Sequence, residues 1–160
     1  MKIPQTNLRI LSKAKNKPRA GDVFAFQVDP IPNLFFFGSV ISTDTKIGGI
    51  ADGGVVLIYL YRTTSADKTI IPSLRTSELL LPPIGTNAIP WTKGYFETVA
   101  RNAEVEALPQ HCFRDARGWF FDEFGNRLPN SIQPVGVYGL SGIGSIDTKI
   151  SKALGIDLKA

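Results

Sequence analysis

The chain has 160 residues, of which 43% are hydrophobic and 20% charged, a composition typical of one globular domain that buries most of its apolar surface. No apolar run approaches the roughly 20 residues that cross a bilayer, and the N-terminus lacks the apolar region and cleavage site of a signal peptide. These features exclude membrane insertion and favour a cytoplasmic location. A single cysteine, Cys112, excludes an internal disulfide framework and a multi-cysteine metal site.

The net charge of +4 is unevenly distributed along the chain. Six basic residues precede the first acidic one, and they are Lys2, Arg9, Lys13, Lys15, Lys17 and Arg19. Subtracting these 6 from 18 basic residues leaves 12 against 14 acidic ones, so the remainder carries about −2. We therefore expect a basic N-terminal arm over residues 1–20 and a single β-rich domain over residues 21–160. Such an arm contacts phosphates or another anionic surface, or is simply a solvated terminus.

Residues 22–28 and 34–42 are rich in Phe and Val and are predicted to form the two strands of a hairpin. Both strands are apolar on both faces, a pattern typical of strands that are covered on both sides. Their five phenylalanines would suit either a stacking platform for bases or a protein core. Because no Lys or Arg lies between Asp22 and Ser42, we interpret these rings as core.

Further short strands are predicted after this hairpin. One covers residues 55–62, after a glycine-rich turn region, and another lies at residues 95–100. A second hairpin is expected around the turn at residues 115–118, and its second arm turns again at residues 123–126. The last predicted strand is residues 135–140.

The helical signal is confined to the end of the chain. Ile146, Ile150 and Leu154 recur at helical spacing, with Ser145 as the predicted N-cap and Gly155 as the terminating residue. The order of elements predicts a mainly β protein, or an α+β protein with few helices. We expect a strongly bent antiparallel sheet or partial barrel with a short C-terminal helix.

The side chains suited to catalysis form no recognisable motif. His111 and Cys112 are adjacent, but neighbours on a strand point to opposite faces, so we interpret both as structural. Asp122 and Glu123 lie beside turns without the spacing of metal ligands. The glycine-rich residues 139–145 lack the lysine of a phosphate-binding loop and the spacing of a dinucleotide fingerprint. We predict no catalytic residue, no metal site and no cofactor.

Three segments in the first three quarters of the chain form an ordered set. Residues 19–25 read Arg-Ala-Gly-Asp-Val-Phe-Ala, residues 37–40 read Phe-Gly-Ser-Val, and Trp91 is followed by Gly94 and a predicted strand. Together these segments resemble the immunity protein 26 family of bacterial polymorphic toxin-immunity systems, over roughly residues 17–121. The family pattern has lysine at the first of these positions and tyrosine at the first position of the second segment, so the match is not complete.

The resemblance implies a largely β-stranded, cytoplasmic, non-enzymatic protein that binds a cognate secreted toxin and blocks it. No catalytic residues come with the family. Under this hypothesis we expect loops and exposed aromatic residues, supported by acidic ones, to carry the interface. The candidates are Trp91, Tyr95, Glu97, Trp119, Phe121, Asp122 and Glu123, although each Trp also fits a core position.

Two other hypotheses remain open from the sequence. The first is a small β-barrel that binds nucleic acid through the basic arm, with affinity that falls steeply as salt rises. Its candidate phosphate contacts are Lys13, Lys15, Lys17 and Arg19. The second is a small hydrolase with an unrecognised carboxylate site. The sequence predicts no membrane partner and does not define an oligomeric state.

Overall fold

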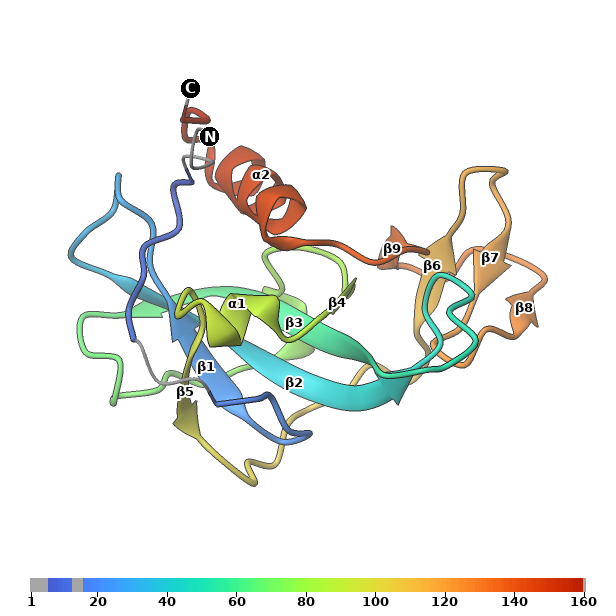
Figure 1. Ribbon diagram of the computed structural model, residues 1–160, viewed down its shortest axis with the longest axis horizontal. Coiled ribbons are helices and arrows are strands. Elements are labelled where there is room, and N and C mark those ends of the chain that lie inside the picture. Colours follow the sequence, from blue (N-terminus) through green and yellow to red (C-terminus); the bar gives the residue numbers. More distant parts are fainter. Residues whose placement is uncertain (1–5, 13–15, 160) are drawn as a thin grey trace.

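The structure is a computed structural model that describes residues 6–12 and 16–159. It is mainly β, with a five-stranded sheet, a four-stranded sheet and a C-terminal helix (Figure 1). The smaller sheet lies at one end of the molecule, beside the far end of the two longest strands. The prediction of a mainly β protein with a C-terminal helix is therefore confirmed.

The larger sheet has the strand order β4-β3-β2-β1-β5, and every neighbouring pair is antiparallel. Its strands are β1 (Val23–Phe26), β2 (Phe35–Thr45), β3 (Val55–Ser65), β4 (Ile84–Thr86) and β5 (Glu97–Ala100). The predicted hairpin, third strand and strand near residue 97 are confirmed. Strands β2 and β3 have 11 residues each and form the longest paired segment of the fold.

The phenylalanines of the β1–β2 hairpin form part of the core. Phe24 stacks on Phe96 with ring centroids 4.5 Å apart, and both rings are fully buried. Gly38, which pairs with Phe24 across the strands, leaves room for this ring, because a Cβ there would enter the ring and lie 2.8 Å from the Tyr59 carbonyl oxygen. The opposite face of β1 is also covered, by a cluster around Phe37. The interpretation of these rings as core is confirmed.

The smaller sheet has the order β8-β7-β6-β9. Its strands are β6 (Cys112–Arg114), β7 (Phe120–Phe121), β8 (Arg127–Leu128) and β9 (Val135–Val137). Such short strands have few sheet hydrogen bonds, and two similar turns connect β6, β7 and β8. In each turn an aspartate accepts two backbone N–H groups through Oδ1, Asp115 at 3.0 and 2.9 Å and Asp122 at 2.9 and 2.9 Å. A glycine with positive φ completes each turn, which confirms both predicted turns.

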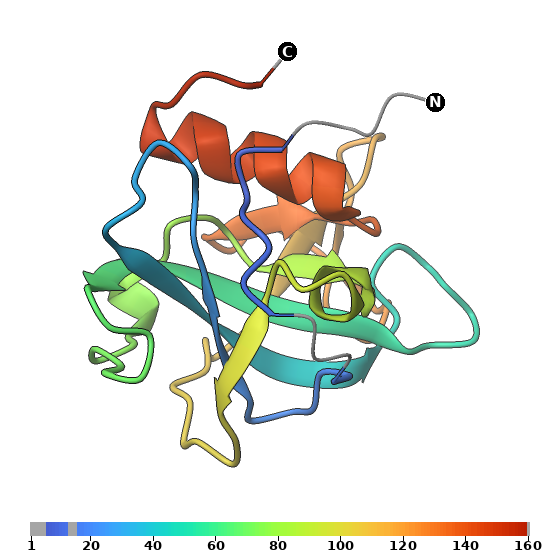
Figure 2. The ribbon, with the colours of Figure 1, turned by 60° about the vertical axis from the view of Figure 1, so that its left-hand side comes forward.

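The C-terminal helix α2 (Ile143–Leu154) lies across the larger sheet (Figure 2). Ile146 and Ile150 are fully buried in the main core, and Gly155 ends the helix in the left-handed conformation at φ 68°, as predicted. The predicted N-cap at Ser145 is wrong, because Gly142 occupies that position. The helix starts earlier because Ile143 also packs against the core. A short helix, α1 (Ile89–Thr92), and a 3-10 turn, η1 (Thr76–Glu78), complete the fold.

The prediction of one strongly bent sheet or partial barrel is wrong. The chain forms two separate open sheets, and neither is closed or strongly curled. The strand order places β4 and β5 at opposite edges of the larger sheet, so closure would require these edges to pair. Instead Gly85 in β4 forms a parallel bridge with Leu140, in the segment that follows β9. The β6–β9 pair is parallel, so the expected antiparallel arrangement also fails there.

The described part of the N-terminal segment packs against the body of the protein. Leu8 is buried and forms a bridge with Val28, and its N–H donates to the Asp147 carboxylate at 3.0 Å. The Asn7 amide donates to the Ser151 hydroxyl at 2.8 Å, so residues 6–12 connect the segment that follows β1 to α2.

Candidate partner-binding surface

The residues predicted to contact a partner fall in two separate regions. Trp91, Tyr95 and Glu97 lie in or beside α1 and β5 of the larger sheet, whereas the others belong to the smaller sheet (Figure 1). The residues in β7 or in the segments directly beside it are Trp119, Phe121, Asp122 and Glu123. A single contact surface therefore does not include all seven.

The three residues near α1 and β5 have mainly structural contacts. Trp91 is 1% exposed and its ring meets those of Phe24 and Phe96 edge-on, each at 5.1 Å. Tyr95 is partly buried against the same core. The Glu97 carboxylate forms an ion pair with Lys68 at 2.7 Å. In this conformation the Trp91 side chain offers almost no surface to a partner.

Trp119 is the exposed aromatic residue of the predicted set. It is 38% exposed, and the guanidinium groups of Arg117 and Arg127 each lie 3.7 Å from the centroid of its ring. Arg117 is held in turn by an ion pair with Asp115 at 2.8 Å. The turn geometry thus presents an Arg-Trp-Arg stack at the surface, and Trp and Arg are the residues most enriched in interface hot spots.

The other predicted residues of the smaller sheet support its structure. Phe121 stacks on Tyr138 with centroids 4.2 Å apart, which ties β7 to the end of β9. The Asp122 carboxylate accepts N–H groups inside its turn, and the Glu123 carboxylate contacts the His111 ring. Both acidic residues therefore already have partners within the protein.

A buried hydrogen-bonded chain joins the two sheets. The Tyr59 hydroxyl in β3 lies 2.5 Å from Nε2 of His111, and Nδ1 of His111 contacts Glu123. The N–H of Leu108 donates to the same hydroxyl at 3.0 Å. Burial raises the pKa of Tyr59 to about 12. Because the Tyr59 and His111 side chains are buried, a substrate would not reach them, and the chain acts as a connection between the sheets.

Sequence reasoning missed this connection. Its residues are 52 and 12 positions apart, and no local pattern brings them together. The only local hint in the sequence was that His111 and Cys112 are adjacent. In the structure the two side chains have different surroundings, as expected of neighbours on a strand. Cys112 is a buried free thiol, while His111 contacts both Tyr59 and Glu123.

A groove of about 230 Å³ lies between the smaller sheet, the approach to β4 and helix α2. Its lining residues are Leu81, Pro82, Pro83, Ile84, Val135, Gly136, Val137 and Lys149. All but the last are apolar or glycine, so a single charged group faces an otherwise apolar cavity. The sequence contained no signal for this groove, because its walls come from three distant segments.

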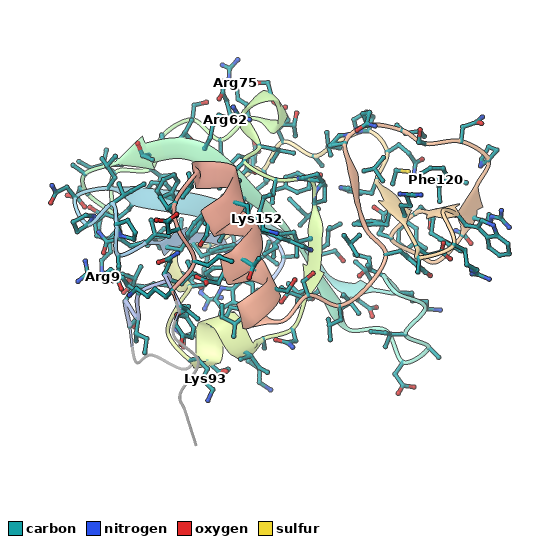
Figure 3. All side chains as sticks on the ribbon, turned by 90° about the horizontal axis from the view of Figure 1, so that it is seen from above. Arg9, Arg62, Arg75, Lys93, Phe120 and Lys152 are labelled. Atoms are coloured by element: carbon teal, nitrogen blue, oxygen red, sulfur yellow. The ribbon has the colours of Figure 1, made fainter. Side chains whose placement is uncertain are left out.

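Exposed apolar residues are concentrated in and around the smaller sheet. Nine large hydrophobic residues of the described chain are well exposed, and five of these lie between residues 119 and 140. The five are Trp119, Phe124, Ile132, Val137 and Leu140. Figure 3 shows the smaller sheet, with Phe120, set apart from the body that carries α2. Such a concentration is typical of an interaction surface.

The residues of the nucleic-acid hypothesis are only partly described. Lys17 and Arg19 are exposed, whereas Lys13 and Lys15 lie outside the described residues. Within the described ranges, no group of three or more His, Cys, Asp or Glu residues is placed to hold a metal ion. No helix in that part of the chain is long and apolar enough to cross a membrane.

Comparison with known protein families identifies a family for this chain. The model of immunity protein 26 matches residues 19–119, which include strands β1 to β6 and helix α1. No curated protein and no solved structure matches the chain. The match covers the three segments on which the resemblance was based, and it covers well over half of the sequence. The chain therefore belongs to the immunity protein 26 family.

Proposed function

We propose that this protein neutralises a cognate toxin by binding it directly, without catalysis, and that the smaller sheet provides the contact surface. Membership of an immunity protein family supports the first part. The observation that carries the second part is the exposed Arg-Trp-Arg stack of Arg117, Trp119 and Arg127, in the region with the most exposed apolar residues.

The position of the family match is consistent with this division. The matched residues 19–119 form the whole of the larger sheet, and β7, β8 and β9 follow them. The match ends at Trp119, so it includes β6 and two residues of the stack, whereas Arg127 and strands β7, β8 and β9 lie beyond it. A surface that must fit one particular toxin can combine residues of the common pattern with residues that lie outside it.

The aromatic residue at the centre of the stack is expected to contribute most of the binding energy. Truncation of a buried interface Trp to Ala typically costs about 2–4 kcal/mol, which corresponds to a roughly 30- to 1,000-fold loss of affinity. The flanking arginines hold the Trp119 ring in place and add charged donors at its edge. The loss should appear mainly as faster dissociation.

The test uses the purified full chain and the toxin domain encoded next to its gene. Calorimetry would measure the dissociation constant of wild type, Trp119→Ala and the control Ile70→Ala, which removes a residue that is 65% exposed and follows β3. We expect at least a 30-fold loss for Trp119→Ala and less than a twofold change for Ile70→Ala.

Two outcomes would contradict different parts of the proposal. If wild type neither binds the toxin nor protects cells that express it, the proposed function is wrong. If Trp119→Ala binds as wild type does, the function stands and the proposed surface is wrong. Binding to nuclease-treated toxin at physiological salt separates this function from a nucleic-acid contact, which would weaken steeply with salt.

A further inference from the structure

Lys149 has an unusual position in the groove beside β9. It belongs to α2, and its neighbour Ile150 is fully buried in the core. The groove walls around it are provided by residues 81–84 and by β9 (Val135–Val137). The position therefore directs a cationic side chain along an apolar surface.

No carboxylate in the described part of the chain forms an ion pair with Lys149. Its Nζ donates a hydrogen bond to the Ser141 hydroxyl at 3.0 Å, which holds the ammonium group at the edge of the groove. Burial lowers the pKa of Lys149, because desolvation disfavours its charged form. A partly buried cation without a counter-charge destabilises a protein, so its presence indicates a role other than stability.

The surface next to the groove also combines apolar side chains with a cation. Val137 is 54% exposed and contributes to both the groove and the outer face of the smaller sheet. It pairs with Arg114 across the parallel β6–β9 ladder, so the two side chains lie on one face. Arg114 is exposed and also has no ion-pair partner among the described residues. An apolar surface is thus bordered by two unpaired cations.

We propose that this groove binds an acidic side chain of the toxin, with its carboxylate against Lys149 and an adjacent apolar side chain between β9 and Pro82-Pro83. The proposal rests on the proposed function, since it assigns the occupant to the toxin. It is also separate from the stack at Trp119, because the two sites are formed by different elements.

Charge and shape favour this occupant over others. A carboxylate supplies the counter-charge that Lys149 lacks, and apolar walls suit an aliphatic or aromatic neighbour. The volume of about 230 Å³ exceeds the roughly 15 Å³ needed for a single water molecule. A phosphate group would need several converging donors, whereas among the described residues Lys149 is the only charged side chain that lines this groove.

The first experiment separates binding from stability. Lys149→Met keeps the length of the side chain and removes its charge, and Lys152→Met is the matched control on the exposed side of the same helix (Figure 3). We expect Lys149→Met to leave the thermal unfolding midpoint unchanged or raise it, while the affinity for the toxin falls at least tenfold. Lys152→Met should change neither value appreciably. If the toxin binds Lys149→Met as tightly as it binds wild type, the proposal is overturned.

The second experiment needs no toxin, so it distinguishes failure of the groove from failure of the proposed function. The probe is 4-methylpentanoate, a 3-methylbutyl group joined to a carboxylate, and its neutral control is 4-methylpentanamide. We expect the acid to shift the amide NMR signals of Val135, Gly136 and Val137 at millimolar concentration. The amide should bind at least fivefold more weakly, and Lys149→Met should remove the difference.

Either of two results would overturn the groove assignment in this experiment. One is the absence of acid-induced shifts at residues of β9. The other is an equal response to the acid and the amide, which would mean that Lys149 recognises no charge. If the probe binds as expected while the toxin does not bind wild type, the groove is confirmed and its assignment to a toxin is wrong.

Discussion

The two sheets of this protein are stabilised in different ways. The larger sheet has strands of up to 11 residues, and its central strands are covered by apolar clusters on both faces. The smaller sheet has strands of two or three residues, and its shape depends on two aspartate turns, a ring stack and the Tyr59–His111–Glu123 connection. We expect the larger sheet to supply most of the stability, and we propose that the smaller sheet supplies recognition. Substitutions in the core of the larger sheet should therefore lower the free energy of unfolding. Substitutions at the surface of the smaller sheet should instead weaken binding and leave the free energy of unfolding nearly unchanged.

The largest expected effect comes from equal truncations in the two regions. Phe24→Ala removes a fully buried ring and should lower the free energy of unfolding by about 3–5 kcal/mol. Phe124→Ala removes a ring that is 63% exposed, in the β7–β8 turn, and should change the free energy of unfolding by less than about 0.5 kcal/mol. Urea unfolding of both variants measures the difference. If both variants lose similar amounts of unfolding free energy, the two sheets do not differ in their contribution to stability.

A pair of glycine substitutions should have the next largest effect. Gly38→Ala places a Cβ into the Phe24 ring and 2.8 Å from the Tyr59 carbonyl oxygen, so we expect a loss of about 2–3 kcal/mol. Gly144→Ala is the control, because nothing lies within 4 Å of a Cβ there. In α2 this change should stabilise the protein by about 0.5–1 kcal/mol. A tolerated alanine at Gly38 would show that the close approach of the strands is not required.

The smallest expected effect concerns the connection between the sheets at high pH. Burial raises the pKa of Tyr59 to about 12 in the folded protein, from its ordinary value of 10.0. The folded state therefore retains this proton longer than the unfolded state. Its contribution to stability is present below pH 10 and is lost as pH rises from about 10 to 12, by up to about 2 kcal/mol.

Tyr59→Phe isolates this contribution. Burial also raises the pKa of Tyr61 and Tyr138, so the variant should still lose some stability in alkali. We expect the gap in unfolding free energy between wild type and Tyr59→Phe to narrow between pH 10 and 12. Chemical denaturation at each pH provides the measurement. If the difference in unfolding free energy between wild type and Tyr59→Phe stays constant from pH 10 to 12, the Tyr59 proton does not contribute to stability as proposed.

Local features of the fold could be predicted because each depends on a few neighbouring residues. The Asp-x-x-Gly-x turns at Asp115 and Asp122 close through hydrogen bonds within five residues. Gly155 ends α2 because its positive φ is accessible to glycine. The N-cap of α2 was missed because packing of Ile143 on the core extends the helix beyond the local signal at Ser145.

The candidate surface was only partly predictable. The sequence named both Trp91 and Trp119 as candidates for the surface and also as residues that fit the core, and it could not separate them. The structure leaves Trp119 38% exposed and covers Trp91 with the core. Each of these tryptophans lies near a turn or a strand end, and whether it is buried depends on which elements pack over it. The groove at Lys149 was missed for the same reason, since residues 81–84, β9 and α2 meet only in three dimensions.

The sequence by itself determined the strands, the turns, the terminal helix and the family, because φ preferences, short-range hydrogen bonds and ordered motifs act within short stretches of chain. Only the tertiary structure decided that the strands form two open sheets, that Tyr59, His111 and Glu123 meet, and that Lys149 lies among apolar side chains with no carboxylate partner among the described residues. These outcomes depend on which distant surfaces become buried together. That choice is made by the whole core, where burial of apolar area outweighs any single local preference.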